Sequence, residues 1–220
     1  MGLNKNTTRK KFVSISMGKL RQRVTPEIEG AKEREITKND GSKHIIHELV
    51  FDSLSGYITG LSFRDNDFGR FLSIEIDGVI LSLNTGYRFF SSFARKFPSI
   101  DLKKEISLAP YDFEGNGKNY KGISTVQEGL KVRDYFYDGK ENLHGMPEPK
   151  DTMEKDDWKI YFLQVEKFLV NFIEEAKKEY KEVALTNDEI KMELSKEENL
   201  AEGVPEIDYE SDINPEDLPF

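Results

Sequence analysis

Residues 56–83 read GYITGLSFRDNDFGRFLSIEIDGVILSL and decide the fold class of the chain. Apolar and polar residues alternate along them, as in strands with one buried face. The first run places Tyr57, Thr59, Leu61 and Phe63 on one side, and the second places Leu72, Ile74 and Ile76 on one side. Polar residues 64–66 indicate a turn between the runs, and Asp77-Gly78 favours a tight hairpin into a third strand, residues 79–83. The stretch predicts an antiparallel meander.

Downstream, a helix and a second hairpin complete this pattern. Phenylalanines at helical spacing predict a short helix over residues 87–97, which ends before Pro98. Residues 106–113 and 120–127 indicate two strands joined by the Gly-Asn-Gly turn at 115–117. Five strands with a helix after the third are the order of an OB-fold, a small barrel that often binds oligonucleotides. We therefore expect a mainly β, OB-fold-like five-stranded barrel, although an antiparallel sheet domain of unrelated role would show similar periodicity.

Upstream of the meander lie further strand signals. Residues 45–51 are strand-like, and residues 25–43 are interpreted as a polar loop. Residues 12–24 indicate a hairpin that turns at Met17-Gly18-Lys19 and places Lys19, Arg21 and Arg23 on the same side. This hairpin would be an N-terminal extension of the barrel, so that residues 1–140 form one DNA-binding domain.

Charge is distributed unevenly along the 220 residues. The formal net charge is −9, but residues 1–140 contain 23 Lys and Arg against 18 Asp and Glu, a net charge of +5. Residues 141–220 contain 9 against 23, a net charge of −14. A basic body with an acidic tail points to nucleic-acid partners. The polar first residues, the absence of Cys and the lack of a long apolar run predict a cytoplasmic protein without signal peptide or membrane contact.

The last third of the chain divides into three parts. Residues 141–156, which contain two prolines, are interpreted as a linker. An apolar stripe at 3.6-residue spacing predicts an amphipathic helix over residues 157–185. Either the chain's own barrel covers this stripe, which we favour, or a second copy does so in a homodimer. Residues 186–220 are predicted to be a disordered acidic tail, because they bury too little to offset an ordering entropy of about 1–2 kcal/mol per residue.

Groups that could catalyse a reaction are few. The absence of Cys excludes disulfides, thiolate zinc sites and a cysteine nucleophile. His44 and His47 would point to opposite faces of a strand, which argues against a zinc site. The acidic residues that could hold magnesium in a nuclease are Asp65, Asp67, Glu75 and Asp77. Because no lysine follows the pair Glu75 and Asp77, solvated strand-end carboxylates are the favoured interpretation, and we expect a protein without enzymatic activity, metal or cofactor.

Aromatic and basic side chains are mixed on the predicted strands and their edges. Binders of single-stranded nucleic acid use this mixture, because cations follow the phosphates and exposed rings stack on bases for about 1–3 kcal/mol each. Phe71 alternates with the predicted core and should point outward. For any one ring, burial explains the sequence equally well, and cations beside turns could simply aid solubility. The candidates are Lys19, Arg21, Arg23, Tyr57, Phe63, Arg64, Arg70, Phe71, Arg88, Tyr111, Phe113, Lys118, Tyr120, Lys121, Arg133, Tyr135 and Tyr137.

The chain ends in EIDYESDINPEDLPF, residues 206–220. A final Phe beside acidic residues can insert its ring into an apolar pocket of a partner while basic residues of that partner pair with the carboxylates. A solubilising tail that ends in Phe by chance is the alternative. The candidate partner-binding residues are Asp212, Glu216, Asp217, Leu218, Pro219 and Phe220.

This tip resembles the acidic tails of bacterial and phage single-stranded DNA-binding proteins, which end in a similar Asp-x-Pro-Phe sequence. Residues 10–140, especially 56–77 and 106–125, are similar in pattern to the phage-encoded members, whereas the predicted helix departs from the bacterial form. The resemblance implies coating of single-stranded DNA during replication, recombination and repair, in the host cytoplasm if the chain is phage-encoded. It also implies that Leu218, Pro219 and Phe220 dock a polymerase, helicase or recombination protein. In some phage relatives the tail competes with DNA for the basic groove.

Two other functions remain open at this point. The chain could be a scaffold that recruits partners through its helix and tail without contacting DNA, or, less favoured, a metal-dependent nuclease.

Overall fold

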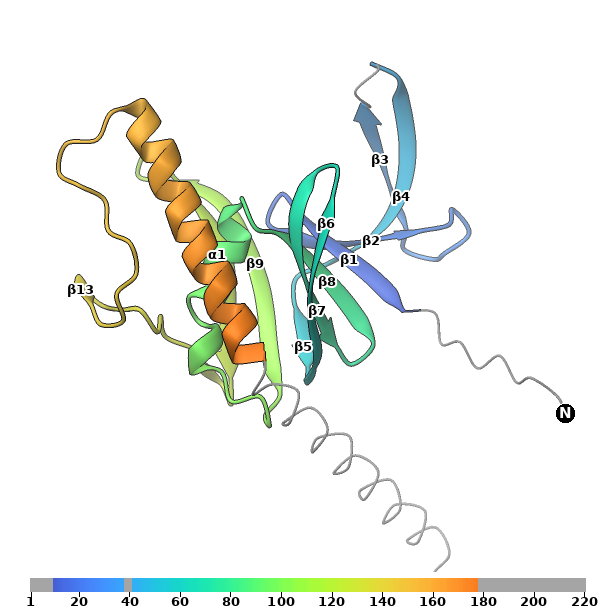
Figure 1. The fold of residues 1–220 in the computed structure, drawn as a ribbon. Helices are drawn as coiled ribbons and strands as arrows, with labels where there is room; N and C mark the ends of the chain where they lie inside the picture. Colours follow the sequence, from blue (N-terminus) through green and yellow to red (C-terminus); the bar gives the residue numbers. More distant parts are fainter. Residues whose placement is uncertain (1–9, 38–40, 178–220) are drawn as a thin grey trace, which may run out of the picture. The chain divides into compact units, whose positions relative to one another are not determined.

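The computed structural model of the chain describes residues 10–37 and 41–177 (Figure 1). Its elements are, in order, β1 (Lys11–Ser16), β2 (Lys19–Val24), β3 (Lys32–Thr37), β4 (Lys43–Phe51), β5 (Leu54–Gly56), β6 (Ile58–Asn66), β7 (Gly69–Ile76), β8 (Val79–Asn84), α1 (Arg88–Ala94), the 3₁₀ helix η1 (Phe97–Ser99), β9 (Ile106–Gly115), β10 (Lys118–Gln127), β11 (Leu130–Lys131), β12 (Tyr137–Asp138) and β13 (Glu141–Asn142). Residues 155–177 form a further helix. The predicted mainly β fold with a C-terminal helix is confirmed.

The described strands form two main sheets. Seven strands lie in the order β3-β4-β2-β1-β8-β7-β6, four in the order β11-β10-β9-β5, and β12 pairs with β13. β1 pairs with β8 in parallel, and the other pairs among the described strands are antiparallel. β5 and β6 are separated only by Tyr57, so one stretch of chain joins both sheets. No sheet of the described residues closes on itself, so a closed barrel is not confirmed.

The central meander is confirmed, with one difference in β6. The predicted apolar face of β7 is fully buried. In β6 the register against β7 shifts between Ile58 and Gly60, which is a β-bulge. Because of this bulge, Ile58 is buried on the side of Leu61, whereas Thr59 stays half-buried. The predicted alternation through Tyr57 and Thr59 is therefore wrong at this point.

Tight two-residue turns join the hairpins. Asp77-Gly78 has φ angles of 45° and 80°, and Asn116-Gly117 has 52° and 69°, as type I′ turns require. Both predicted turns are thus confirmed. The turn predicted at residues 64–66 lies instead at 67–68, because β6 remains paired with β7 as far as Asn66 opposite Gly69.

The loop predicted over residues 25–43 contains a strand. β3 pairs antiparallel with β4 from Lys32 opposite Glu48 to Thr37 opposite Lys43. The sequence of β3 is charged on both of its faces, so it carries no alternation of apolar and polar residues. Its pairing with β4, rather than a buried apolar face of its own, makes it a strand.

The helices pack on one hydrophobic core with the sheets. α1 and η1 cover the helix predicted over residues 87–97, and the rings of Phe90 and Phe93 are fully buried. The helix of residues 155–177 buries Leu169 and Ile173 in the same core, so the chain itself covers this part of the apolar stripe. The rest of the predicted helix, and the tail predicted over 186–220, lie outside the described residues. None of the described helices combines the length and apolar composition needed to cross a membrane.

The segment predicted as a linker is anchored to the core. Met146 is buried, and its backbone N–H and C=O bond to the Asn142 side-chain oxygen and nitrogen at 3.1 and 2.6 Å. Phe136 just before it is fully buried as well. Residues 136–146 therefore belong to the folded body, and the helix begins at residue 155.

Candidate nucleic-acid interface

The outward face of β2, β4 and β3, here called the outer sheet face, is rich in cations. Directly opposed residues of paired strands share a face, and neighbours along a strand alternate. Leu20 of β2 is buried in the core, so its neighbours Arg21 and Lys19 lie on the opposite side. The register then assigns these residues to the outer sheet face: Lys19, Arg21, Arg23, Lys32, Arg34 and Glu48. β3, which the sequence did not reveal, thus adds two cations to the three predicted ones.

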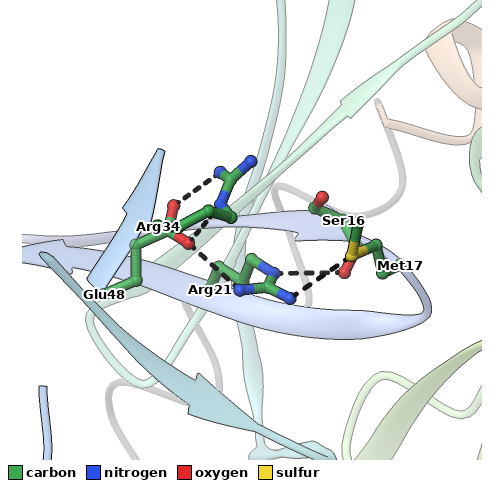
Figure 2. Close-up of polar contacts among 5 residues, drawn as sticks. All are labelled: Ser16, Met17, Arg21, Arg34 and Glu48. Carbon is green, nitrogen blue, oxygen red and sulfur yellow. Dashed lines mark hydrogen bonds and ion pairs between the residues drawn. The ribbon is translucent and has the colours of Figure 1, made fainter. Parts of the chain in front are cut away.

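Two of these cations are held by a buried carboxylate (Figure 2). Glu48 is 2% exposed. The Arg34 guanidinium donates to both of its oxygens, from Nε to Oε2 and from Nη2 to Oε1, each at 2.8 Å, and Arg21 Nη1 donates to Oε2 at 3.1 Å. These bonds, chiefly the one from Arg34, hold the pKa of Glu48 below its usual range against the opposing effect of burial. The carboxylate is therefore ionised at neutral pH and fixes both guanidinium groups.

The other cations of the outer sheet face differ in their pairing. Lys19 forms an ion pair of 2.5 Å with Asp52 just beyond β4. Arg23 and Lys32 are exposed and form no ion pair among the described residues. Of the five cations on this face, three thus form ion pairs within the chain, although Arg21 and Arg34 share one carboxylate.

The hairpin of β9 and β10 carries three aromatic rings on its outward face, here called the hairpin rings: Phe113 and Tyr120, which are exposed, and Tyr111, which is half-buried. Phe113 and Tyr120 are cross-strand partners, 55% and 41% exposed, and their rings stack with centroids 5.3 Å apart and planes 19° apart. Tyr111 lies 5.9 Å from Phe113 and opposite Gly122, where an added Cβ would come within 2.6 Å of the tyrosine oxygen. Gly122 thus makes room for the ring of Tyr111.

Cations surround the hairpin rings. Lys118 is exposed beside the turn and forms no ion pair within the described part of the chain. Arg88 of α1 is exposed and donates to the Asn119 carbonyl at 3.4 Å. Lys121 pairs with Asp112 at 2.8 Å and lies 5.7 Å from the centre of the Phe89 ring.

α1 covers the outer edge of β10. The Ser92 hydroxyl accepts from the Ile123 N–H at 3.0 Å and donates to the Ile123 carbonyl at 3.3 Å, and the Lys96 ammonium donates to the same carbonyl. These bonds satisfy backbone groups that an open strand edge would expose. They also fix Arg88, which lies one turn before Ser92 on α1, beside the hairpin rings.

The outer sheet face and the hairpin rings meet at the turn between β1 and β2. Gly18 in this turn has φ of 67°, and a Cβ added there would lie 2.5 Å from the Asp112 backbone nitrogen. The turn therefore rests against the backbone of β9 beside Tyr111.

Two predicted residues face the C-terminal helix instead. Phe63 is half-buried and contacts the Phe90 ring edge-on at 6.5 Å. Arg70 lies over Phe63 at 4.8 Å and pairs with Glu174 of the helix at 2.5 Å. The structure thus separates this pair from the hairpin rings.

The remaining predicted residues are scattered. Arg64 is exposed opposite half-buried Phe71 on the outward side of β6 and β7, and Arg133 is exposed between β11 and β12. Tyr57 is half-buried, and its N–H donates to Asp77 Oδ2 at 3.0 Å. The predicted Tyr135 stacks on His144 with ring centroids 3.9 Å apart, and the Arg95 guanidinium lies 5.0 Å above the ring centre of the predicted Tyr137. Asp212, Glu216, Asp217, Leu218, Pro219 and Phe220 lie outside the described residues.

The acidic residues considered for a nuclease make other contacts. Glu75 pairs with Lys10 at 2.7 Å, Asp65 lies 3.9 Å from Arg70, and Asp77 accepts the bond from Tyr57. Within residues 10–37 and 41–177, no group of three or more His, Asp or Glu side chains is arranged to hold a metal ion.

Comparison of the chain with protein-family profiles, with curated proteins and with solved structures finds no match.

Proposed function

We propose that the protein binds single-stranded DNA without sequence preference and without catalysis. The observation that carries the proposal is the exposed, stacked pair Phe113 and Tyr120, flanked by Arg88 and Lys118. Large rings exposed on a strand lose the benefit of burial, and bases stack on such rings whatever their identity. Adjacent cations supply the charge that follows the phosphates.

The connectivity of the strands supports an OB-fold-like architecture. The stretch β5–β6 pairs with β7 in one sheet and with β9 in the other, α1 follows β8, and β9 and β10 form the last long hairpin. The difference from a closed five-stranded barrel lies at β8, whose outer edge is taken by β1. The N-terminal hairpin thus extends the sheet and adds the outer sheet face to the surface beside the hairpin rings.

A salt series tests the proposal. Binding of fluorescent oligo-dT by the full chain should weaken steeply with salt, since the logarithm of the affinity falls by about 0.7 per neutralised phosphate for each tenfold rise in salt. A duplex of the same length serves as the control and should bind more weakly. A preference for the duplex, or an affinity that ignores salt, would contradict the proposal.

We also propose that the acidic tip of the chain recruits replication or recombination proteins. Its support is the sequence of residues 206–220, in which Leu218, Pro219 and Phe220 follow a run of acids. Removing residues 206–220 should leave the affinity for oligo-dT unchanged or higher and abolish capture of a polymerase or helicase from the same cell. If the truncation instead abolishes oligo-dT binding, this division of roles is wrong.

A further inference from the structure

A cleft of about 880 Å³ lies between α1, the β9–β10 hairpin and the helix of residues 155–177. Figure 1 shows this helix, in orange, next to α1. The volume falls within the range of about 300–1,000 Å³ typical of ligand sites. Of the predicted residues, Arg88, Tyr111 and Lys121 line the cleft, and the side formed by the helix was not predicted from the sequence.

The first half of this helix carries aromatic rings beyond the part that is buried in the core. Phe162 is 58% exposed and lines the cleft with Tyr161. Trp158 contacts both, with ring centroids 5.8 and 5.7 Å away. Ile160 and Leu163 are exposed as well, and Leu163 also lines the cleft. A contiguous group of exposed apolar side chains marks an interaction site, so this half of the helix is expected to have a binding partner.

The opposite wall of the cleft is cationic. Arg88, Arg95, Lys96 and Lys121 line this wall. With Lys159 of the helix and the two acids Asp134 and Glu166, the side chains that line the cleft have a net charge of +3. Arg95 pairs with Asp134 through Nη2 at 2.5 Å, but its Nε is buried and has no hydrogen-bond partner among residues 10–37 and 41–177. Burial lowers the pKa of Lys96, so an anion in the cleft would favour its charged form. Rings on one wall and cations on the other match a ligand that carries both planar groups and negative charge.

The cleft continues the surface of the hairpin rings. Tyr111 belongs to those rings and also lines the cleft, and Arg88 reaches both the cleft and the Asn119 carbonyl beside Tyr120. A chain that stacks on Phe113 and Tyr120 therefore reaches the cleft next.

Tyr87, which precedes α1, is 64% exposed and lines the wall of the cleft that faces Phe162. We propose that this cleft is a second stacking subsite for single-stranded DNA, in which bases stack on Phe162 and Tyr87 while phosphates pair with Arg88 and Arg95. This inference rests on the proposed function and deepens it. It assigns the first half of the helix to DNA binding, in addition to the packing role of its second half. The other occupant with compatible chemistry is an acidic peptide, which the experiment distinguishes.

Trp158 makes the test direct, because it is the single tryptophan of the chain and contacts Phe162. The full chain is titrated with labelled oligo-dT while the anisotropy of the label and the emission of Trp158 are followed together. Both signals should saturate at the same DNA concentration. Phe162→Ala should weaken binding by about 5- to 150-fold, the range of a lost base stack. Phe51→Ala removes an exposed ring from β4, away from the cleft, and should change the affinity less than twofold.

The outcomes separate this inference from the proposed function. Oligo-dT binding with unchanged Trp158 emission and an unaffected Phe162→Ala variant would overturn the subsite and leave DNA binding intact. A synthetic peptide of residues 206–220 that changes Trp158 emission where oligo-dT does not would assign the cleft to acidic peptides and overturn the subsite as well. If the full chain binds no oligo-dT by anisotropy, the proposed function fails and the subsite fails with it. Thermal unfolding of each variant verifies that it is folded.

Discussion

The outer sheet face and the β9–β10 hairpin both carry lysine or arginine side chains, but these cations differ in their pairing. On the outer sheet face, Glu48 and Asp52 hold three of the five cations, and the guanidinium groups of Arg21 and Arg34 are fixed by a carboxylate that is almost fully buried. On the hairpin, Lys118 has no ion pair among the described residues, and the neighbouring rings are exposed. Cations that look equivalent in the sequence thus differ in pairing: Lys19, Arg21 and Arg34 are held by carboxylates of the outer sheet face, whereas Lys118 beside the hairpin rings remains available for a ligand.

The ion pairs of the outer sheet face also explain how the charged strand β3 can fold. β3 has little apolar surface, yet Arg34 attaches it to Glu48 on β4, and Arg21 attaches β2 to the same carboxylate. A buried carboxylate shared by three strands fixes their register, because slipping any strand would leave a charge unpaired.

Replacing Glu48 should have the largest effect, and it should appear in stability. Glu48→Gln leaves the mostly buried Arg21 side chain, 14% exposed, without its anion. Breaking a buried pair costs about 3–5 kcal/mol, and we expect about 3 kcal/mol because Arg34 retains access to water. Urea unfolding measures the loss of unfolding free energy. A loss below about 0.5 kcal/mol would show that the three-strand contact contributes little.

Removing a hairpin ring should mainly affect DNA binding. Phe113→Ala should weaken oligo-dT binding by about 5- to 150-fold, because one stacked base is worth about 1–3 kcal/mol. Its stability should change little, since the ring is more than half exposed. Fluorescence anisotropy measures the affinity, and Phe51→Ala is the matched control with an exposed ring on another strand. Equal affinities of the two variants would contradict a role for the hairpin rings.

The dependence of the unfolding free energy on pH should show the contribution of the ionised Glu48 carboxylate directly. The pKa of Glu48 is lowered in the folded chain, so its stabilising contribution is present above the unfolded value of about 4.3 and is lost as the pH falls through the lowered pKa. Below about pH 4.3, the unfolding free energy of the wild type should therefore approach that of Glu48→Gln. Parallel denaturant titrations at several pH values measure the difference. A difference between the two proteins that stays constant down to pH 2 would exclude this linkage.

The smallest effect is expected from exchanging single lysines. Lys118→Gln should make the slope of log affinity for oligo-dT against log salt shallower by about 0.7, which is the contribution of one phosphate contact on a single strand. Lys19→Gln, the matched control, should reduce it less, because Asp52 already neutralises that ammonium. The slope of log affinity against log salt gives both values. A larger change of slope for Lys19→Gln than for Lys118→Gln would contradict the view that Lys118 is the more available of the two cations.

The sequence predicts those parts of the fold in which local pattern and burial agree. The alternation in β7 and the Asp-Gly turn before β8 are strong local signals, and both are confirmed. β3 was missed because its stabilising partner, Glu48, lies on another strand and cannot be inferred from residues 32–37. The anchoring of the segment around Met146 was missed for a similar reason, since single buried residues produce no periodicity.

The candidate interface could be predicted only as a group of residues. Phe63 and Phe113 look alike in the sequence, both on alternating strands beside charged residues. The structure places Phe63 against Phe90 near the C-terminal helix and leaves Phe113 exposed, because the helix packs on one sheet surface and not on the outward face of the hairpin. Which side of a strand a helix covers is decided by tertiary packing, so periodicity alone could not separate these two rings.

The parallel pairing of β1 with β8 has a consequence for how the chain is made. Lys11 of β1 lies opposite Val79 of β8, so a ribosome must synthesise about seventy more residues before the earliest strand meets this neighbour. Until then one edge of the nascent N-terminal hairpin is open, and contacts between residues so distant in sequence form slowly. β8 is the last strand of the seven-stranded sheet to be synthesised, so the sheet can be completed only after β8 has left the ribosome.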